Sequence, residues 1–368
     1  LVFASLSFYV NTATGCKTYK EYVMTNSVLN TELAIIQAPM AGVQNAKLTV
    51  AVCEAGGLGS LPCAMLSIEQ LKSELDYISL NTDKPYNLNF FCHQTPDYTL
   101  AQQTAWHGVL APYFEELNVD ASQLTRNASR QPINQQVIDI IAPYKPAVVS
   151  FHFGLPNKDI VSQIKAWGGT VLSSATTLDE ARWLQANGAD AIIAQGIEAG
   201  GHRGHFLSMN LSLQPTTVQL VRECVELDIP VIAAGGICAS EDVAQYQALG
   251  VIAVQVGSAY LLCEEATTSA LHREVLKTAE PDSTELTTLL SGRPARGVRN
   301  RVMQELGAMP EQAPPFPYAS IAMTALRSKA EAKGDSGFSP LWCGERFIVR
   351  EGINAEQITA LLMQGWQS

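Results

Sequence analysis

The sequence predicts a fold of the α/β class built on a parallel sheet, and two observations carry this prediction. The first is a set of eight short apolar runs, rich in Val, Ile and Ala and mostly without strict alternation, as in strands buried on both faces. The second is that helical patterns with short connections separate several of the runs, as in βαβ units. The runs occupy residues 34–40, 58–62, 86–91, 147–152, 170–175, 191–196, 231–236 and 253–258.

Two helical segments show the repeat most clearly. Residues 178–187 end at Gly188, and residues 240–249 have Ser240 as the expected N-cap and stop at Gly250. Eight such units predict a (β/α)8 barrel, the TIM-barrel fold. A doubly wound open sheet is the alternative, but its G-x-G-x-x-G fingerprint does not follow the first run.

The pattern divides the chain into four parts. Residues 24–260 hold the eight runs and are expected to form the barrel. Residues 261–340 are mainly helical in pattern around a Pro-rich break, and we expect a small helical substrate or lid domain inserted after strand eight. Residues 341–368 should return to the barrel with its closing helix. Residues 1–23 start without Met and lack a basic n-region, so we interpret them as a leader or an expression-derived segment.

Composition and charge restrict the classes of function. The net charge of −11, without a basic cluster, argues against nucleic-acid binding, and no run of 18 apolar residues predicts a membrane span. The eight cysteines are scattered without C-x-x-C or zinc spacing. We therefore expect reduced thiols, no metal site and a cytoplasmic location. The sequence leaves the oligomeric state undetermined.

The most informative segment is QGIEAGGHRG at 195–204. It directly follows an apolar run and contains four glycines. A loop of this kind exposes backbone N–H groups that can hold an anion such as phosphate. Gly235-Gly236 and Gly257-Ser258 end the next two runs, where barrels commonly bind phosphate. Any one glycine could serve only a tight turn, but the three sites together predict a phosphate-bearing ligand.

Polar side chains at strand ends complete the predicted site. Asn89, Gln195 and Gln255 suit a planar heterocycle because each amide offers a donor and an acceptor, although any one of them could be a core residue with satisfied bonds. His152 ends an otherwise apolar strand, where a neutral imidazole can bond a substrate oxygen or accept a carbon-bound proton. The alternative for His152 is a structural bond to backbone. His202 could touch phosphate or substrate, or brace its loop.

Several of these motifs together resemble one known family over residues 34–260. SFHFGLP and the GGHRG loop are the more specific motifs, whereas AAGGI and the Gly-Ser pair occur in many FMN barrels. The matching segments are QAPMAGV (37–43), PYNLNFF (85–91), SFHFGLP (150–156), QGIEAGGHRG (195–204), AAGGI (233–237) and QVGSAY (255–260). The chain is similar to the class I nitronate monooxygenases, formerly called 2-nitropropane dioxygenases.

This resemblance implies a non-covalently bound FMN and His152 as the active-site histidine. It implies oxidation of a small nitronate of the propionate 3-nitronate type, or of a nitroalkane, by O2 to a carbonyl compound and nitrite, a detoxification. Ring and ribityl contacts are implied for the backbone of Pro39, Met40 and Ala41 and for the side chains of Asn89, Gln195 and Gln255. Phosphate contacts are implied for Gly200, Gly201, Gly235, Gly236, Gly257 and Ser258.

Two other functions stay open at this point. An NAD(P)H-dependent FMN reductase of quinones or enoyl thioesters would share the barrel and the flavin motifs, although no feature of the sequence shows a nicotinamide site. A phosphate-binding barrel without flavin, acting as an isomerase or a ligand binder, would share the glycine sites.

Overall fold

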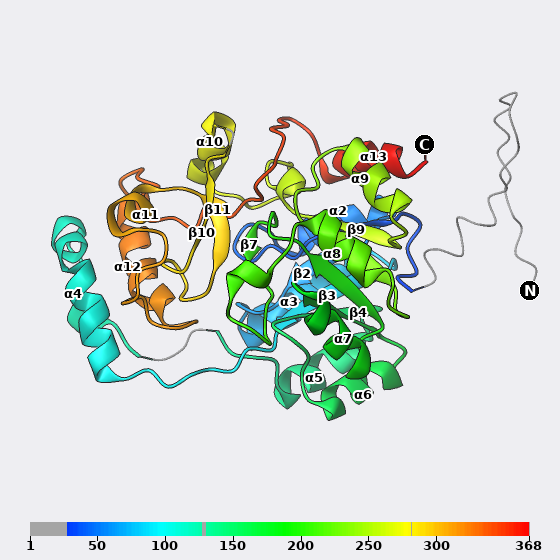
Figure 1. Ribbon diagram of the computed structural model, residues 1–368, viewed down its shortest axis with the longest axis horizontal. Coiled ribbons are helices and arrows are strands. Elements are labelled where there is room, and N and C mark those ends of the chain that lie inside the picture. Colours follow the sequence, from blue (N-terminus) through cyan, green and yellow to red (C-terminus); the bar gives the residue numbers. More distant parts are fainter. Residues whose placement is uncertain (1–27, 127–129, 281, 368) are drawn as a thin grey trace, which may run out of the picture.

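The computed structural model describes residues 28–126, 130–280 and 282–367, in which eight parallel strands form a barrel (Figure 1). The order around the sheet is β1-β9-β8-β6-β5-β4-β3-β2, and a parallel bridge between Ile36 and Leu58 closes the ring. Each predicted run contains one strand, so the predicted barrel is confirmed. The strands are β1 (Ile35–Gln37), β2 (Gly59–Pro62), β3 (Tyr86–Phe91), β4 (Val148–His152), β5 (Thr170–Ala175), β6 (Ala191–Gln195), β8 (Val231–Ala234) and β9 (Ala253–Val256).

Helices cover the outside of the barrel, and short 3-10 turns join some of them. Helix α13, near the C-terminus, packs on α9 and α2 and so covers the seam beside β1. The barrel helices are α2 (Ala46–Glu54), α3 (Ile68–Asn81), α5 (Gln135–Ile141), α6 (Lys158–Ala166), α7 (Leu178–Ala186), α8 (Thr217–Cys224), α9 (Ser240–Ala248) and α13 (Ala355–Gln367). The 3-10 turns are η1 (Ala121–Gln123), η2 (Ala142–Tyr144), η3 (Leu211–Leu213) and η4 (Ser258–Tyr260).

The start of α9 differs from the prediction, because Ser240 is not its N-cap. Ala239 occupies the cap position, and the Asp242 carboxylate accepts the N–H groups of Cys238 (2.9 Å) and Ala239 (3.0 Å). Asp242 also accepts from Arg346 at 2.8 Å. A carboxylate in the first turn satisfies free N–H groups and matches the helix dipole, which a serine one residue after the cap position cannot do.

A second region lies beside the barrel mouth, and it contains more than the helices predicted after strand eight (Figure 1). Strands β10 (Thr284–Thr287) and β11 (Ala295–Val298) form an antiparallel pair, and β11 also pairs with β7 (Gly201–His202), in the loop after β6. The crossover from β3 to β4 supplies helix α4 (Leu100–Leu117), which packs against α12. The remaining helices of the region are α10 (Ala270–Thr278), α11 (Arg301–Leu306) and α12 (Ala319–Glu331).

Apolar packing explains why α4 joins this region although it is far away in sequence. Trp106 and Leu110 of α4 are fully buried in one cluster with Leu326 of α12 and Phe338. Full burial of a large apolar side chain contributes about 1.5–3 kcal/mol, and most of the stability of a helix in a protein comes from such packing of its apolar face. The strands and inner helix faces of the barrel form their own buried clusters.

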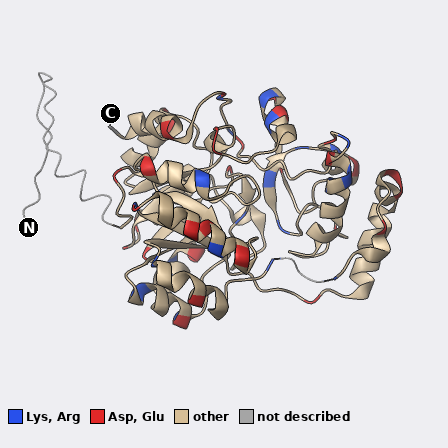
Figure 2. Cartoon of the chain, turned by 180° about the vertical axis from the view of Figure 1, so that it is seen from behind, with Lys and Arg blue, Asp and Glu red and all other residues tan. Residues whose placement is uncertain are grey.

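Lys and Arg as well as Asp and Glu are spread over the helices in the view of Figure 2. Of the eight cysteines, the seven in the described residues are free thiols, and all but Cys92 are buried. Within the described ranges, every helix is too short or too polar to span a membrane.

Candidate active site

One cavity opens at the C-terminal ends of the barrel strands and extends under the second region. The carboxyl ends of parallel strands meet at this rim, which is where barrel enzymes place their active sites. The cavity brings together all thirteen residues predicted from the sequence. They are Pro39, Met40, Ala41, Asn89, His152, Gln195, Gly200, Gly201, Gly235, Gly236, Gln255, Gly257 and Ser258.

Six of these residues form what we call the glycine cradle, in the loops after β6, β8 and β9. They are Gly200, Gly201, Gly235, Gly236, Gly257 and Ser258. Gly200 needs to be glycine because an added Cβ would lie 2.5 Å from the Cys343 carbonyl carbon and the Gly344 nitrogen. The Ser258 hydroxyl accepts the Gly344 N–H at 2.8 Å. The segment around residue 343 therefore packs directly against the cradle.

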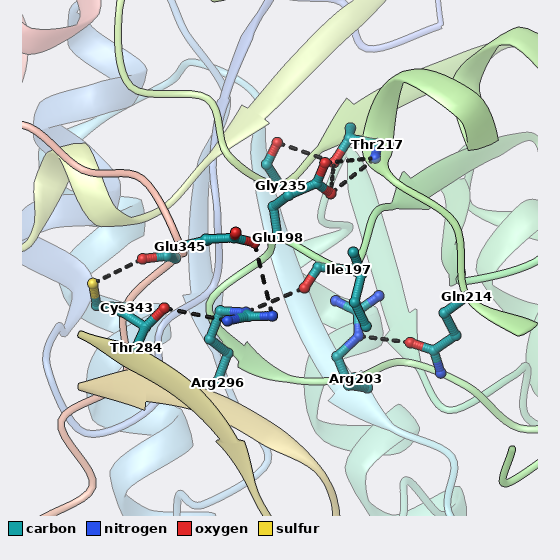
Figure 3. A network of polar contacts seen from close by, with 11 residues as sticks. Ile197, Glu198, Arg203, Gln214, Thr217, Gly235, Thr284, Arg296, Cys343 and Glu345 are labelled. Carbon is teal, nitrogen blue, oxygen red and sulfur yellow. Dashed lines mark hydrogen bonds and ion pairs between the residues drawn. The ribbon is translucent and has the colours of Figure 1, made fainter. Parts of the chain in front are cut away.

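Glu198 occupies the N-terminus of α8, close to this cradle. Its carboxylate accepts the backbone N–H of Thr217 at 2.9 Å and the Thr217 hydroxyl at 2.8 Å (Figure 3). A helix N-terminus favours an anion, and here the carboxylate of the protein itself takes that place. A ligand phosphate would depend on the N–H groups of the glycine cradle instead.

Two arginines, Arg203 and Arg296, hold the loop that follows β6. Arg203 is fully buried, and its guanidinium donates to the Gln195 carbonyl and to Gln214, each at 2.8 Å. Arg296 of β11 donates to the Ile197 carbonyl at 3.2 Å, and its guanidinium lies 3.8 Å from Glu345 (Figure 3). The arginine of the GGHRG motif therefore supports the loop from within.

The predicted amides differ in how much of their bonding capacity the protein uses. Gln195 is used at both ends, because its Nε2 donates to the His202 carbonyl at 3.0 Å and its Oε1 accepts the Gly204 N–H at 2.8 Å. Asn89 donates to the Ser150 hydroxyl at 2.9 Å. The Gln255 Oε1 is buried without a hydrogen-bond partner among the described residues. The Gln255 oxygen therefore keeps its capacity to accept a hydrogen bond from a ligand.

The turn after β1 uses part of its own backbone. The Met40 N–H donates to the side chain of Gln44 at 2.8 Å, and the Met40 carbonyl accepts from the Val43 N–H. Both backbone groups of Met40 are therefore used within the turn. Of the three backbone positions predicted to face a ring, Met40 has the least hydrogen-bonding capacity left, and Pro39 offers only its carbonyl because proline has no N–H.

His152 ends β4 with both ring nitrogens within hydrogen-bonding distance of protein groups. Nε2 lies 3.1 Å from the His202 carbonyl, and Nδ1 lies 3.0 Å from the Ser174 hydroxyl. A carbonyl only accepts, so Nε2 carries the proton and Nδ1 accepts from Ser174. Burial, assisted by the charges of Arg293 and Arg203, lowers the His152 pKa to about 3. His152 is therefore a neutral imidazole with a fixed tautomer at neutral pH.

We call His152 and three other cavity-lining residues the side-chain wall: Phe91, Arg130, His152 and His202. The Phe91 ring lies 6.0 Å from that of His152 and 6.3 Å from that of His202. The His202 Nε2 lies 2.9 Å from the Ser291 hydroxyl, and burial holds the His202 pKa well below its ordinary value. Both histidines of the wall are therefore neutral at neutral pH.

Two cations of this region, Arg130 and Arg293, were not predicted from the sequence. Arg130 lines the cavity, and the Arg293 guanidinium lies 4.0 Å from the centre of the Phe153 ring. Burial lowers the pKa of each guanidinium to about 10, so both keep their charge. Neither arginine stands at a strand end or in a recognisable motif, so no local signal marks it. In the described part of the chain, no cluster of His, Cys, Asp or Glu could hold a metal ion.

This geometry defines a class before any comparison: a (β/α)8 barrel with a glycine-lined cradle and a neutral histidine at its mouth. The sequence profile of the family described as Nitronate monooxygenase matches residues 23–365. The chain therefore belongs to the nitronate monooxygenase family, and it is an oxidoreductase of this kind. The nitronate monooxygenases of Paraburkholderia phytofirmans and Pseudomonas aeruginosa are 38% and 37% identical, over 91% and 92% of this chain and 92% and 97% of theirs.

Solved structures agree with this assignment. The nitroalkane oxidase of Streptomyces ansochromogenes superposes with a TM-score of 0.82 at 31% identity, covering 93% of this chain and 99% of that one. FabK from Thermotoga maritima has a TM-score of 0.69 at 25% identity, covering 94% and 96%. The likeness to the nitroalkane oxidase is greater on both measures.

Proposed function

We propose that this enzyme uses FMN to oxidise alkyl nitronates with O2, giving a carbonyl compound and nitrite. The observation that carries the proposal is one cavity that joins the glycine cradle to a neutral histidine of fixed tautomer. The cradle supplies N–H groups for a phosphate, and the unpartnered Gln255 oxygen supplies an acceptor for a ring N–H. When bound, FMN would supply the electron transfer, which no side chain of this site can perform.

His152 would orient the nitronate by donating its Nε2 proton to a nitronate oxygen. That donation would replace the bond to the His202 carbonyl, which still accepts from Gln195 at 3.0 Å. The carbonyl therefore loses no essential partner when His152 turns to the substrate. A preorganised donor aimed at a charged oxygen in a site without bulk water contributes a large share of rate enhancement.

The same tautomer disfavours His152 as a base toward neutral nitroalkanes. Nε2 already carries its proton, and Nδ1 accepts from Ser174. Removal of a carbon-bound proton would require the opposite tautomer, which would place a bare nitrogen against a carbonyl oxygen. A nitronate is already deprotonated at this carbon, so we propose the anion, rather than the nitroalkane, as the substrate.

An aerobic assay of the FMN-loaded protein tests the proposal. Nitrite release and oxygen uptake are measured with propionate 3-nitronate and with 3-nitropropionate, and we expect kcat/KM to be at least about 100-fold higher for the nitronate. Absence of nitrite with either substrate would contradict the function. A protein that binds no FMN would favour the barrel without flavin, and rapid anaerobic bleaching by NADH would favour the reductase.

A further inference from the structure

Arg130 is a half-buried cation on the cavity wall without a compensating anion among the described residues. One terminal nitrogen of its guanidinium, NH1, is buried and has no hydrogen-bond partner among the described residues. None of the ion pairs within those residues includes Arg130. An unpaired buried charge is strongly unfavourable, so its presence beside a cavity points to a ligand that carries the missing anion.

Among the arginines that line the cavity, Arg327 and Arg346 each have a carboxylate partner, and Arg130 has none among the described residues. Arg327 of α12 also lines the cavity, but its Nε donates to the Glu331 carboxylate at 2.7 Å. The nearest compensation for Arg130 is the Phe316 ring, whose centre lies 5.5 Å from the guanidinium carbon. A cation–π contact of this kind contributes about 0.5–2 kcal/mol, well below the desolvation cost of a buried charge.

The position of Arg130 places it near the proposed reaction centre. Its charge helps to lower the pKa of His202, and the Phe316 ring below it lies 5.6 Å from the His202 ring. The His202 carbonyl in turn lies 3.1 Å from the His152 Nε2. Arg130 therefore belongs to the side-chain wall and is separate in sequence and chemistry from the glycine cradle.

We propose that Arg130 recognises a carboxylate on the tail of the nitronate, while His152 bonds the nitronate end. This inference rests on the proposed function and adds a residue that selects between its substrates. A guanidinium can bind a carboxylate through two parallel N–H···O bonds. The otherwise unpaired NH1 nitrogen provides one donor for such a pair. Arg293, over the neighbouring Phe153 ring, adds positive potential on the same side.

The experiment compares propionate 3-nitronate with butyl-1-nitronate, which has an uncharged tail of similar length. In Arg130→Gln, we expect kcat/KM for propionate 3-nitronate to fall about 10- to 100-fold, mainly through KM, because a charge-assisted bond is lost. Activity with butyl-1-nitronate should change less than about threefold. Arg130→Lys should recover part of the loss. The matched surface control is Arg182→Gln, because Arg182 lies on α7 with a largely exposed side chain.

Binding to the FMN-loaded enzyme gives an independent readout. Succinate, a dianion of similar shape, and butyrate, its singly charged counterpart, are titrated while the flavin absorbance is followed. We expect wild-type enzyme to bind succinate about tenfold more tightly than butyrate, and Arg130→Lys to keep part of that preference. Equal affinities in the wild type would overturn the proposal even if Arg130→Gln does not fold.

The remaining outcomes separate this inference from the proposed function. Equal losses with both nitronates in Arg130→Gln would overturn the carboxylate role and leave the function intact. A loss of discrimination in Arg327→Gln instead of Arg130→Gln would move the subsite to the α12 side and also overturn it. Failure of wild-type enzyme to oxidise either nitronate would contradict the function itself.

Discussion

The glycine cradle and the side-chain wall line the same cavity but are built in different ways. The cradle consists of backbone groups at the ends of neighbouring strands, with Gly200 fitted closely against Cys343 and Gly344. The wall consists of side chains from β3, β4, the loop after β6 and the crossover that carries Arg130. The difference teaches that a backbone site is encoded locally, whereas a side-chain site is assembled by the fold.

The first and largest test of this comparison adds a side chain to the glycine cradle at Gly200. In Gly200→Ala the added Cβ would overlap backbone atoms at 2.5 Å, so we expect the free energy of unfolding to fall by about 4 kcal/mol. Gly201→Ala is the matched control, because its Cβ would meet no atom within 4 Å and only its φ of +69° is unfavourable. A loss of about 1 kcal/mol is expected there. Urea unfolding measures both, and equal losses would contradict the packing argument.

The second change addresses the wall. His152→Asn should retain FMN and lower kcat/KM for the nitronate about 100-fold, or about 3 kcal/mol, because the oriented donor is lost. Ser174→Ala keeps the imidazole but removes the hydroxyl that fixes its tautomer, and we expect a loss of about tenfold. Steady-state nitrite release measures both variants, and flavin absorbance checks cofactor content. Unchanged turnover in His152→Asn would remove this residue from the mechanism.

The third prediction concerns His205, a buried histidine in the loop after β6 that also carries His202. Burial lowers the pKa of His205 to about 3, whereas the unfolded value is about 6.5. Between these values the unfolded chain holds a proton that the native state lacks, so stability falls as the pH drops below about 6.5. One such histidine contributes about 1.4 kcal/mol for each pH unit.

The test is the pH dependence of stability in a His205 variant. His205→Gln should flatten the loss of unfolding free energy between pH 6.5 and 5.5 by about 1 kcal/mol. His107→Gln is the control, because His107 is only half-buried and should change the slope less. Urea titrations at each pH provide the measurement. Parallel curves for wild type and His205→Gln would show that His205 is protonated in the native state.

The smallest expected effects are on stability, and they test whether Ser240, the cap predicted from the sequence, or Asp242, the acceptor in the structure, caps α9. Asp242→Asn should lower the free energy of unfolding by about 1 kcal/mol, because the charged acceptor of two N–H groups is lost. Ser240→Ala should change it by less than about 0.5 kcal/mol, since its hydroxyl does not cap the helix. Thermal unfolding distinguishes the two, and a larger effect of Ser240→Ala would restore the original prediction.

The fold could be predicted from the sequence because its signals are local and repeated. Eight Val-, Ile- and Ala-rich runs each hold one strand of the barrel. The hairpin of β10 and β11 was missed because β11 also pairs with β7, a contact between residues almost a hundred positions apart. Helix α4 was not assigned to the second region, since its position depends on packing against α12.

The features of the candidate site likewise divide into those with a local sequence signal and those that depend on the folded structure. Glycines and polar residues at strand ends were identifiable, because parallel strands bring their carboxyl ends to one rim. The use of Gln195 to hold its own loop, and of Glu198 to cap α8, depended on loop conformation that the motif does not encode. Arg130 and Arg293 carried no signal, because an arginine in a loop is usually solvated and only burial makes its charge informative.

By itself, the sequence determined the barrel, the positions of the cradle glycines and the histidine at the end of β4. Each of these follows from backbone conformation or strand periodicity, which depends on near neighbours in the chain. Only the tertiary structure decided the tautomer of His152, the neutrality of the wall histidines and the unpaired charge of Arg130. These properties depend on burial and on partners brought from distant segments. Water is excluded from the side chains concerned only when the chain has folded.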